Sequence, residues 1–322
     1  MGQPTLIVTG GGGFIGSCLV RHLLSQNAGK IVACDISSNT TNLTDVLDCV
    51  EFARADVGSF ESVLRLFDKY RPQTVYHLGA MLAPACEAAP ETGIHVNGVG
   101  TYYLLEAARL FGTKQVIFAS SITVFTNSRK DSVIDDYSST RPNNVYAAAK
   151  VFSENLGLSY RRQYGLDFRS LRIPGMVGPG LRAHGFFEYV SKAIGAAIAG
   201  EPYSVCVDPR TRIPVMYLDD LARAFTDLAA TPIERVPTAN YLVLGPTPVP
   251  SAGEMVERVK SKIPGAQLDF KIDPAVQEII DTLPKAFDDR YAREEWGWRP
   301  RYNLDDIIDA FIAQGERPSK QV

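Results

Sequence analysis

Two side chains with acid–base chemistry, Tyr146 and Lys150, stand four positions apart in the segment YAAAK. Residues four apart on a helix lie on the same face. A lysine ammonium beside a phenol favours the phenolate and so lowers the pKa of that phenol. The pair therefore predicts a tyrosine base that takes the proton of an alcohol near neutral pH. The alternative is a solvated helix face, because this spacing is common by chance.

A further hydroxyl for the same chemistry stands 25 residues before Tyr146, where Ser120 and Ser121 end the segment QVIFASS. A hydroxyl at the end of a strand can hydrogen-bond the oxygen that reacts, and we expect Ser121 to do so. The alternative is a strand-end serine that only satisfies nearby backbone groups.

A glycine-rich segment, TGGGGFIG, places Gly10, Gly13 and Gly16 between an apolar strand and a helix. Such glycines let the backbone approach a pyrophosphate seated on the helix N-terminus. Asp35 ends the next predicted strand, 19 residues after Gly16, where its carboxylate can accept from the ribose hydroxyls of a dinucleotide. No arginine follows it directly, so the pattern favours NAD over NADP. A flexible turn and a strand-end turn residue are the structural alternatives.

The segments that must position these residues alternate between short apolar strands and helices. The expected strands begin near residues 6, 31, 51, 74, 115 and 168, and the expected helices span 14–27, 60–70, 90–110 and 144–164. This alternation predicts a doubly wound parallel sheet with helices on both faces. Ligands of such sheets bind beyond the carboxyl ends of the strands. We therefore expect the glycine loop, Asp35, Ser121 and Tyr146 to meet at one edge.

The sequence changes character after Arg172. Residues 173–185 are rich in glycine and proline and include Arg182 and His184, and we hypothesise that they form a lid. A helix over 186–200, strands over 203–207 and 213–217, a helix over 218–230 and a capping box of Ser251 and Glu254 are expected beyond them. The prediction is an NAD-binding domain over residues 1–172, to which 211–232 return, and a smaller, interwoven α/β substrate-binding domain over 173–322.

Composition limits the partners of the chain. The 322 residues carry 33 basic and 36 acidic side chains, a net charge of −3, which gives no electrostatic reason to expect nucleic acid or a membrane surface. No apolar run approaches the roughly 20 residues of a membrane span, and the first nine residues lack the features of a signal peptide. Five scattered cysteines indicate a cytoplasmic protein, and four dispersed histidines indicate no metal site.

Together with Asp56-Val57, the segment HLGA (residues 77–80) and Asn97 in HVNGVGT, these motifs resemble the extended short-chain dehydrogenase/reductase superfamily, in its NAD-dependent epimerase/dehydratase family. The resemblance covers essentially the whole chain and implies a Rossmann domain with a smaller substrate domain. It implies Ser121, Tyr146 and Lys150 as catalytic residues. The residues that it assigns to NAD are Gly10, Gly13, Phe14, Ile15, Gly16, Asp35, Asp56, Val57, Leu78, Gly79, Ala80, Asn97, Tyr146, Lys150 and Pro174.

Three further segments, RSLRIPG, TRIPVMYLDD and FDDRYAREEWGWRPRYNL, are similar to the short-chain type of L-threonine 3-dehydrogenase. Pro174 occupies the position at which the sugar-nucleotide epimerases of the family carry an asparagine. Polar groups that hold an amino acid in the threonine branch are replaced, a serine by Ala83 and two threonines by Phe186 and Phe187. Losing such hydroxyls costs recognition strongly, so the resemblance favours a substrate other than threonine itself.

The expected substrate contacts are Ala83, Ser121, Phe186 and Arg212. A guanidinium can clamp a carboxylate or phosphate with two hydrogen bonds, although an interdomain salt bridge is an equal alternative for Arg212.

The resemblance implies an NAD-dependent enzyme that interconverts a secondary alcohol and a ketone on a small polar substrate of the hydroxy acid, β-hydroxy amino acid or sugar acid type. The alternatives are a sugar or nucleotide-sugar epimerase with tightly bound NAD, and a non-catalytic NAD-sensing regulator. Apolar helices over 98–110 and after Tyr146 resemble those that form a homodimer in this superfamily, and ordinary core packing explains them equally well.

Overall fold

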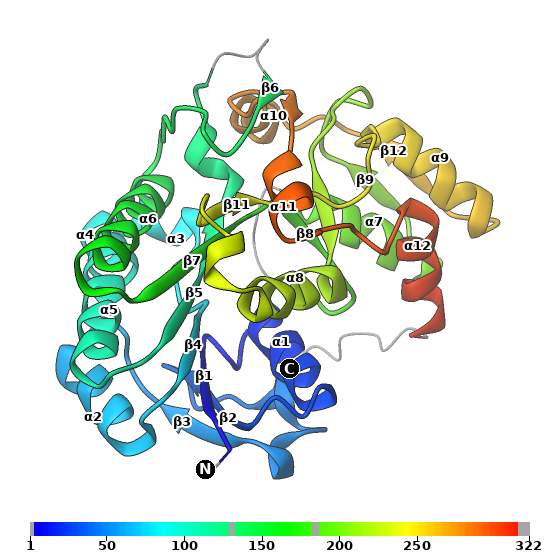
Figure 1. Cartoon of the computed structure of the whole chain (residues 1–322). Helices are drawn as coiled ribbons and strands as arrows, with labels where there is room; N and C mark the ends of the chain where they lie inside the picture. Colours follow the sequence, from blue (N-terminus) through cyan, green and yellow to red (C-terminus); the bar gives the residue numbers. More distant parts are fainter. Residues whose placement is uncertain (1–2, 129–132, 182–186, 315–322) are drawn as a thin grey trace.

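Seven parallel strands form the central sheet, in the order β11-β7-β5-β4-β1-β2-β3 (Figure 1). The structure is a computed structural model that describes residues 3–128, 133–181 and 187–314. The strands of the sheet are β1 (Thr5–Thr9), β2 (Lys30–Asp35), β3 (Glu51–Arg54), β4 (Thr74–His77), β5 (Gln115–Ser121), β7 (Asp167–Ile173) and β11 (Asn240–Leu242). The chain runs outward from β1 through β2 to β3 and then returns to β4 on the other side of β1. Ligands of such sheets bind at this switch point.

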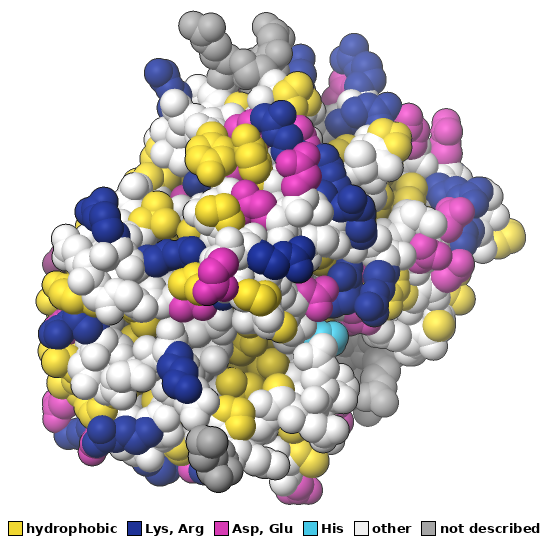
Figure 2. All heavy atoms as spheres, in the orientation of Figure 1, with side chains coloured by type: hydrophobic (Ala, Val, Ile, Leu, Met, Phe, Trp, Pro, Cys, Tyr) yellow, Lys and Arg dark blue, Asp and Glu magenta, His cyan; other side chains and the backbone are white. Residues whose placement is uncertain are grey.

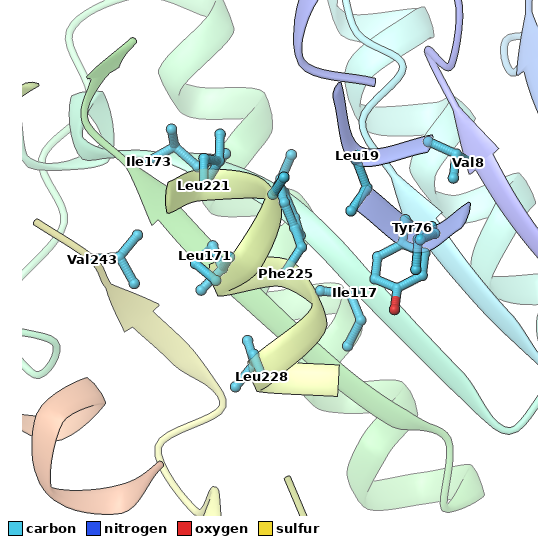
Figure 3. Packing of buried hydrophobic residues seen from close by; sticks show 14 of the residues in the cluster. Val8, Leu19, Tyr76, Ile117, Leu171, Ile173, Leu221, Phe225, Leu228 and Val243 are labelled. Carbon is cyan, nitrogen blue, oxygen red and sulfur yellow. The ribbon is translucent and has the colours of Figure 1, made fainter. Parts of the chain in front are cut away.

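Helices cover both faces of the sheet, which confirms the predicted doubly wound architecture. One face carries α2 (Phe60–Tyr70), α5 (Gly100–Leu110) and α6 (Val145–Tyr164), and the other carries α1 (Phe14–Ser25) and α8 (Leu218–Ala230). In Figure 3, Leu221 and Phe225 of α8 lie beside Leu171 of β7. Because both faces are covered, the strands are apolar on both sides.

Side-chain caps define where two helices begin. Asn144 opens α6 by accepting from the backbone N–H of Ala147 at 2.8 Å, and Ser59 opens α2 by accepting from Ser62. A cap satisfies one of the free N–H groups of the first turn. The start of α6, and with it the position of Tyr146, is therefore encoded locally.

The helix predicted over residues 90–110 is confirmed, with one interruption. The structure has α3 (Ala83–Ala88), and then a continuous helical segment made of α4 (Pro90–Ile94), a π-helical turn over His95–Val99 and α5. Such turns inside α-helices occur frequently at functional sites. This turn carries Asn97, whose side chain bonds the loop after β4.

A second group of elements packs around a separate hydrophobic core, to which α7, α9 and α12 contribute (Figure 1, upper right). Two strand pairs contribute to this core: β8 (Gly175–Val177) with β10 (Val215–Tyr217), and β9 (Tyr203–Val205) with β12 (Leu268–Phe270). Its helices are α7 (Tyr189–Ala199), α9 (Ala252–Lys262), α10 (Pro274–Ile280) and α12 (Leu304–Ala313). A further pair, β13 (Ala286–Phe287) with β6 (Val133–Ile134), packs in a small separate cluster, and α11 (Arg290–Glu295) packs into the first core. The predicted capping box of Ser251 and Glu254 opens α9.

The strand predicted over 213–217 does not return to the central sheet. Its residues Val215–Tyr217 pair with β8, and β11 joins the sheet beside β7 instead. The helix that follows, α8, does pack into the first core. The domain boundary at residue 172 stays a prediction. Across the described ranges, no helix has the length and apolar character needed to cross a membrane.

Candidate functional site

The glycine loop lies between β1 and α1, at the switch point of the sheet. Gly10 has a φ of +68°, and a Cβ there would stand 2.9 Å from the backbone nitrogen of Gly79. A Cβ on Gly16 would stand 2.1 Å from the Gly10 carbonyl oxygen, so α1 packs directly on the loop. Gly13 precedes α1 without a side-chain cap. The N–H groups of the first turn, including those of Phe14 and Ile15, therefore lack side-chain acceptors and suit an anion.

Asp35 lies at the end of β2 and faces the same loop. Its Oδ2 accepts from the backbone N–H of Gly12 and its Oδ1 from that of Ser37, each at 3.2 Å. A carboxylate retains further acceptor sites after two such bonds. Loop and acid together fit the diphosphate and ribose of a dinucleotide, as the sequence predicts.

Asp56 and Val57 follow β3, the neighbouring strand. The Asp56 carboxylate accepts from the Gly58 N–H at 2.8 Å, and its backbone N–H donates to Ser62. Val57 lies against α5, since a Cβ on Gly100 would stand 3.0 Å from the Val57 carbonyl oxygen. Asp35 and Asp56 thus stand at the carboxyl ends of adjacent strands.

A chain of hydrogen bonds that the sequence did not reveal holds the loop after β4. Thr9 Oγ1 lies 2.8 Å from His77 Nδ1, and His77 Nε2 lies 3.2 Å from Thr101 Oγ1. Thr101 donates its own hydrogen to the Asn97 carbonyl at 2.7 Å. It therefore accepts from Nε2–H, and Nδ1 accepts from Thr9. Burial, followed by the Lys150 charge, lowers the pKa of His77 to about 3, so the ring is neutral.

Leu78, Gly79 and Ala80 are held in place by both ends of this chain. Thr9 Oγ1 accepts from the N–H groups of Leu78 and Gly79, each at 3.1 Å. The buried Asn97 side chain bonds both the N–H and the carbonyl of Met81, at 2.8 and 2.9 Å. Asn97 therefore shapes the backbone of this segment.

Tyr146 and Ser121 meet beyond the end of β5. Ser121 lies close enough to the phenol to lower the pKa of Tyr146, and Ser121 Oγ accepts from both the N–H and the hydroxyl of Thr123, at 3.2 and 3.0 Å. Because Thr123 supplies these two donors, the Ser121 hydrogen is directed elsewhere, toward the phenol. Thr123 carried no signal in the sequence that marked it for this contact.

Lys150 is buried beneath the same pair. Its Nζ donates to the Ala119 carbonyl at 2.7 Å and stands 5.4 Å from the centre of the Tyr146 ring. Burial lowers the pKa of Lys150 to about 8, and the negative charge of Glu154 opposes this. The thiol of Cys86 also lies near Lys150, and burial raises its pKa.

The expected effect of Lys150 on the tyrosine is not what the structure shows. Burial raises the pKa of Tyr146 to about 12, and the bond from Ser121 is what opposes this rise. The helical spacing of Lys150 correctly places it beside the ring, but the cost of burying a phenolate is larger than any help from the lysine.

The residues expected to contact substrate lie on separate elements of the structure. Ala83 is the first residue of α3 and half-buried, and Pro174 is buried between β7 and β8. Arg212 donates to both carboxylate oxygens of Glu254, each at 2.8 Å. It therefore forms a salt bridge and is not a free clamp for a substrate anion. Phe186, Arg182 and His184 lie outside the described residues.

A doubly wound sheet with a glycine loop at its switch point and an acid at the end of β2 defines a Rossmann-type dinucleotide-binding enzyme. The chain belongs to the NAD-dependent epimerase/dehydratase family, whose family model matches residues 6–243. Its relatives place it in the extended short-chain dehydrogenase/reductase type, and its cofactor is NAD.

The chain is similar to proteins of two activities. It is 28% identical over 313 residues to the mitochondrial L-threonine 3-dehydrogenase of Sus scrofa, covering 96% of this chain and 82% of the relative. It superposes with a TM-score of 0.87 and 28% identity on a monomeric L-threonine 3-dehydrogenase from a metagenome, covering 96% of this chain and 98% of that one. The UDP-glucose 4-epimerase of Thermotoga maritima shares the fold, with a TM-score of 0.82, 22% identity, and coverage of 97% and 100%.

These similarities confirm the predicted family, fold class and cofactor. The roles of the individual residues stay predictions.

Proposed function

We propose that the protein oxidises a secondary alcohol to a ketone with NAD⁺, or catalyses the reverse. The observation that carries this proposal is the meeting of Ser121, at the end of β5, with Tyr146 of α6, and Lys150 Nζ buried 5.4 Å from the centre of the Tyr146 ring. A paired hydroxyl and phenol at this edge can hold one substrate oxygen between them.

Each residue has a distinct task in the reaction. Ser121 donates a hydrogen bond to the substrate oxygen, and Tyr146 Oη takes the hydroxyl proton. The glycine loop and Asp35 would hold NAD⁺, which would supply the acceptor for the hydride of the substrate carbon. Lys150 binds the nicotinamide ribose, and the positive charge beside the phenol favours the phenolate that burial disfavours.

The substrate is proposed as a small hydroxy acid, β-hydroxy amino acid or sugar acid. The names of the threonine dehydrogenase relatives support a β-hydroxy amino acid. Ala83, in place of a serine that helps hold an amino acid in that branch, favours a different member of the set. The test is a screen of NADH formation over hydroxy acids, β-hydroxy amino acids, aldonates and free sugars. Threonine as the best substrate would overturn the inference drawn from Ala83.

The second candidate is an epimerase with tightly held NAD, which the shared fold of the Thermotoga maritima enzyme favours. An epimerase returns the hydride to the opposite face of the same carbon, so it releases no NADH. Net NADH formation therefore separates the two. NAD binding without turnover of any alcohol or sugar would instead support a regulator.

Homodimer formation and a cytoplasmic location belong to the same proposal. Exposed apolar side chains gather on neighbouring helices: Ile94 of α4, Tyr102 and Leu110 of α5, and Phe152 and Tyr164 of α6. A second copy would cover them. Light scattering of the purified chain tests the dimer.

All five cysteines are free, which suits a reducing compartment. On the face in Figure 2, basic and acidic side chains are interspersed, and this supports a small-molecule partner over nucleic acid.

A further inference from the structure

Three residues spaced one helical turn apart on α6 contact three consecutive residues of β5. Tyr146 lies beside Ser121, which lowers the pKa of the phenol, and Lys150 Nζ donates to the carbonyl of Ala119 at 2.7 Å. One turn further, Glu154 Oε1 accepts from the hydroxyl of Ser120 at 2.6 Å. The carboxyl end of β5 is thus held by α6 through three successive side chains, of which the sequence singled out only the first two.

Glu154 is also half of a buried ion pair. Arg172 of β7 donates to Glu154 Oε1 at 3.0 Å and to Oε2 at 2.8 Å, and the two side chains are 6% and 3% exposed. Arg172 stands opposite Ser120 in the β5–β7 register and donates further to the Asp136 carbonyl at 2.7 Å. The carboxylate is therefore fixed from both strands. A buried, two-point pair of this kind is sensitive to the loss of either partner.

We propose that Glu154, fixed by Arg172 and Ser120, is a positioning residue that sets α6 on β5 and places its carboxylate one helical turn beyond Lys150. The inference rests on the role proposed above for Lys150, which is to bind the nicotinamide ribose. Glu154 reaches neither the cofactor loop nor Tyr146 and acts through the lysine.

The groups that face Lys150 come from four elements. They are Tyr146 and Glu154 of α6, His77 of β4, Cys86 of α3, and the Ala119 carbonyl and Phe118 ring of β5. Burial raises the pKa of both Tyr146 and Cys86 and lowers that of His77. These three groups are therefore uncharged at neutral pH, and Glu154 is the anion of the set.

The charge of Glu154 determines in which direction the pKa of Lys150 changes when the carboxylate is removed. Burial lowers the pKa of Lys150 to about 8, and Glu154 opposes this. Removing the carboxylate charge lowers that pKa further, by about one unit for a nearby ion pair. NADH binding that depends on Lys150 in its protonated form is lost as the pH rises through this pKa. The midpoint of that loss therefore moves to lower pH.

The experiment measures NADH affinity against pH by fluorescence for the whole chain and its variants. Lys150→Met identifies the part of the profile that belongs to the lysine. Glu154→Gln keeps the shape and the acceptor for Ser120, and we expect its midpoint to fall by about one pH unit. The matched control is Asp167→Asn, which breaks another two-point pair on β7, with Arg169, at 2.7 and 2.8 Å. Its midpoint should stay at the wild-type value.

A folded Glu154→Gln variant with the wild-type midpoint would overturn the inference, as would an equal shift in Asp167→Asn. If the single variant does not fold, Glu154→Gln with Arg172→Met removes both buried charges. The midpoint should still fall, but by less than in the single variant, because the positive charge of Arg172 is lost together with the carboxylate. The inference is also rejected if the wild-type NADH affinity shows no pH-dependent step that Lys150→Met removes. A wild-type chain that shows the titration but oxidises no alcohol rejects the proposed function instead.

Discussion

The hydroxyl of Thr9, at the end of β1, donates to Nδ1 of His77, at the end of β4, over 2.8 Å. The same oxygen accepts from the N–H groups of Leu78 and Gly79. One side chain therefore joins the glycine loop to the segment after β4 across the switch point of the sheet. The geometry of the cofactor site depends on this hydroxyl although it is fully buried.

Replacing Thr9 with valine keeps the shape of the side chain and removes all of these bonds. Two backbone N–H groups and the His77 ring lose a partner, so we expect a loss of about 1–3 kcal/mol in the free energy of unfolding together with weaker NADH binding. Urea denaturation and NADH fluorescence measure the two effects. The control is Thr113→Val, since the buried Thr113 hydroxyl bonds only the Pro72 carbonyl, at the opposite end of the sheet. Equal loss of NADH affinity in both variants would contradict the prediction.

The buried His77 makes stability depend on pH. Its pKa in the folded protein is lowered from 6.5 to about 3, mainly by burial. The unfolded chain binds this proton at a higher pH, so the stabilising contribution is complete above about pH 6.5 and is lost as the pH falls toward 3. The limiting slope is about 1.4 kcal/mol per pH unit. Urea midpoints measured between about pH 7 and pH 5 should fall less in His77→Gln than in the wild type. A His77→Gln variant whose urea midpoint falls as steeply as that of the wild type would contradict the prediction.

The hydroxyl of Thr123 should matter for turnover because it directs the Ser121 hydrogen. Thr123→Val removes one of two donors to Ser121 Oγ, and we expect kcat to fall about fivefold, as for the loss of one ordinary hydrogen bond. Thr123→Ser restores the donor and should restore kcat. A valine variant that turns over as fast as the serine variant would show that Ser121 orients itself without this contact.

Local signals account for what the sequence predicted well. The helix α6 begins after Asn144 and ends before Gly165, as expected, and the capping box at Ser251 opens α9. The glycine loop and Asp35 met at one edge because parallel strands bring their carboxyl ends together. The π-helical turn at Asn97 was missed, since nothing in the hydrophobic periodicity distinguishes it from a continuing helix.

Contacts between distant residues account for what could not be predicted. His77 and Glu154 have no special neighbours in the chain, and their partners Thr9 and Arg172 are 68 and 18 residues away. The spacing of Lys150 placed it correctly beside Tyr146. It could not predict the pKa of the phenol, because that value depends on burial among several elements.

Tyr146→Phe is the decisive substitution for the proposed chemistry. The variant keeps the ring that packs beside Lys150 and removes the oxygen that takes the substrate proton. General-base catalysis contributes about 10²–10⁴ in rate, so kcat should fall by this factor while the NADH dissociation constant stays near the wild-type value. Tyr102→Phe is the control, because Tyr102 is exposed on α5. Near-normal turnover of Tyr146→Phe would remove the tyrosine from the mechanism, whereas a parallel loss of NADH binding would assign it to the cofactor site alone.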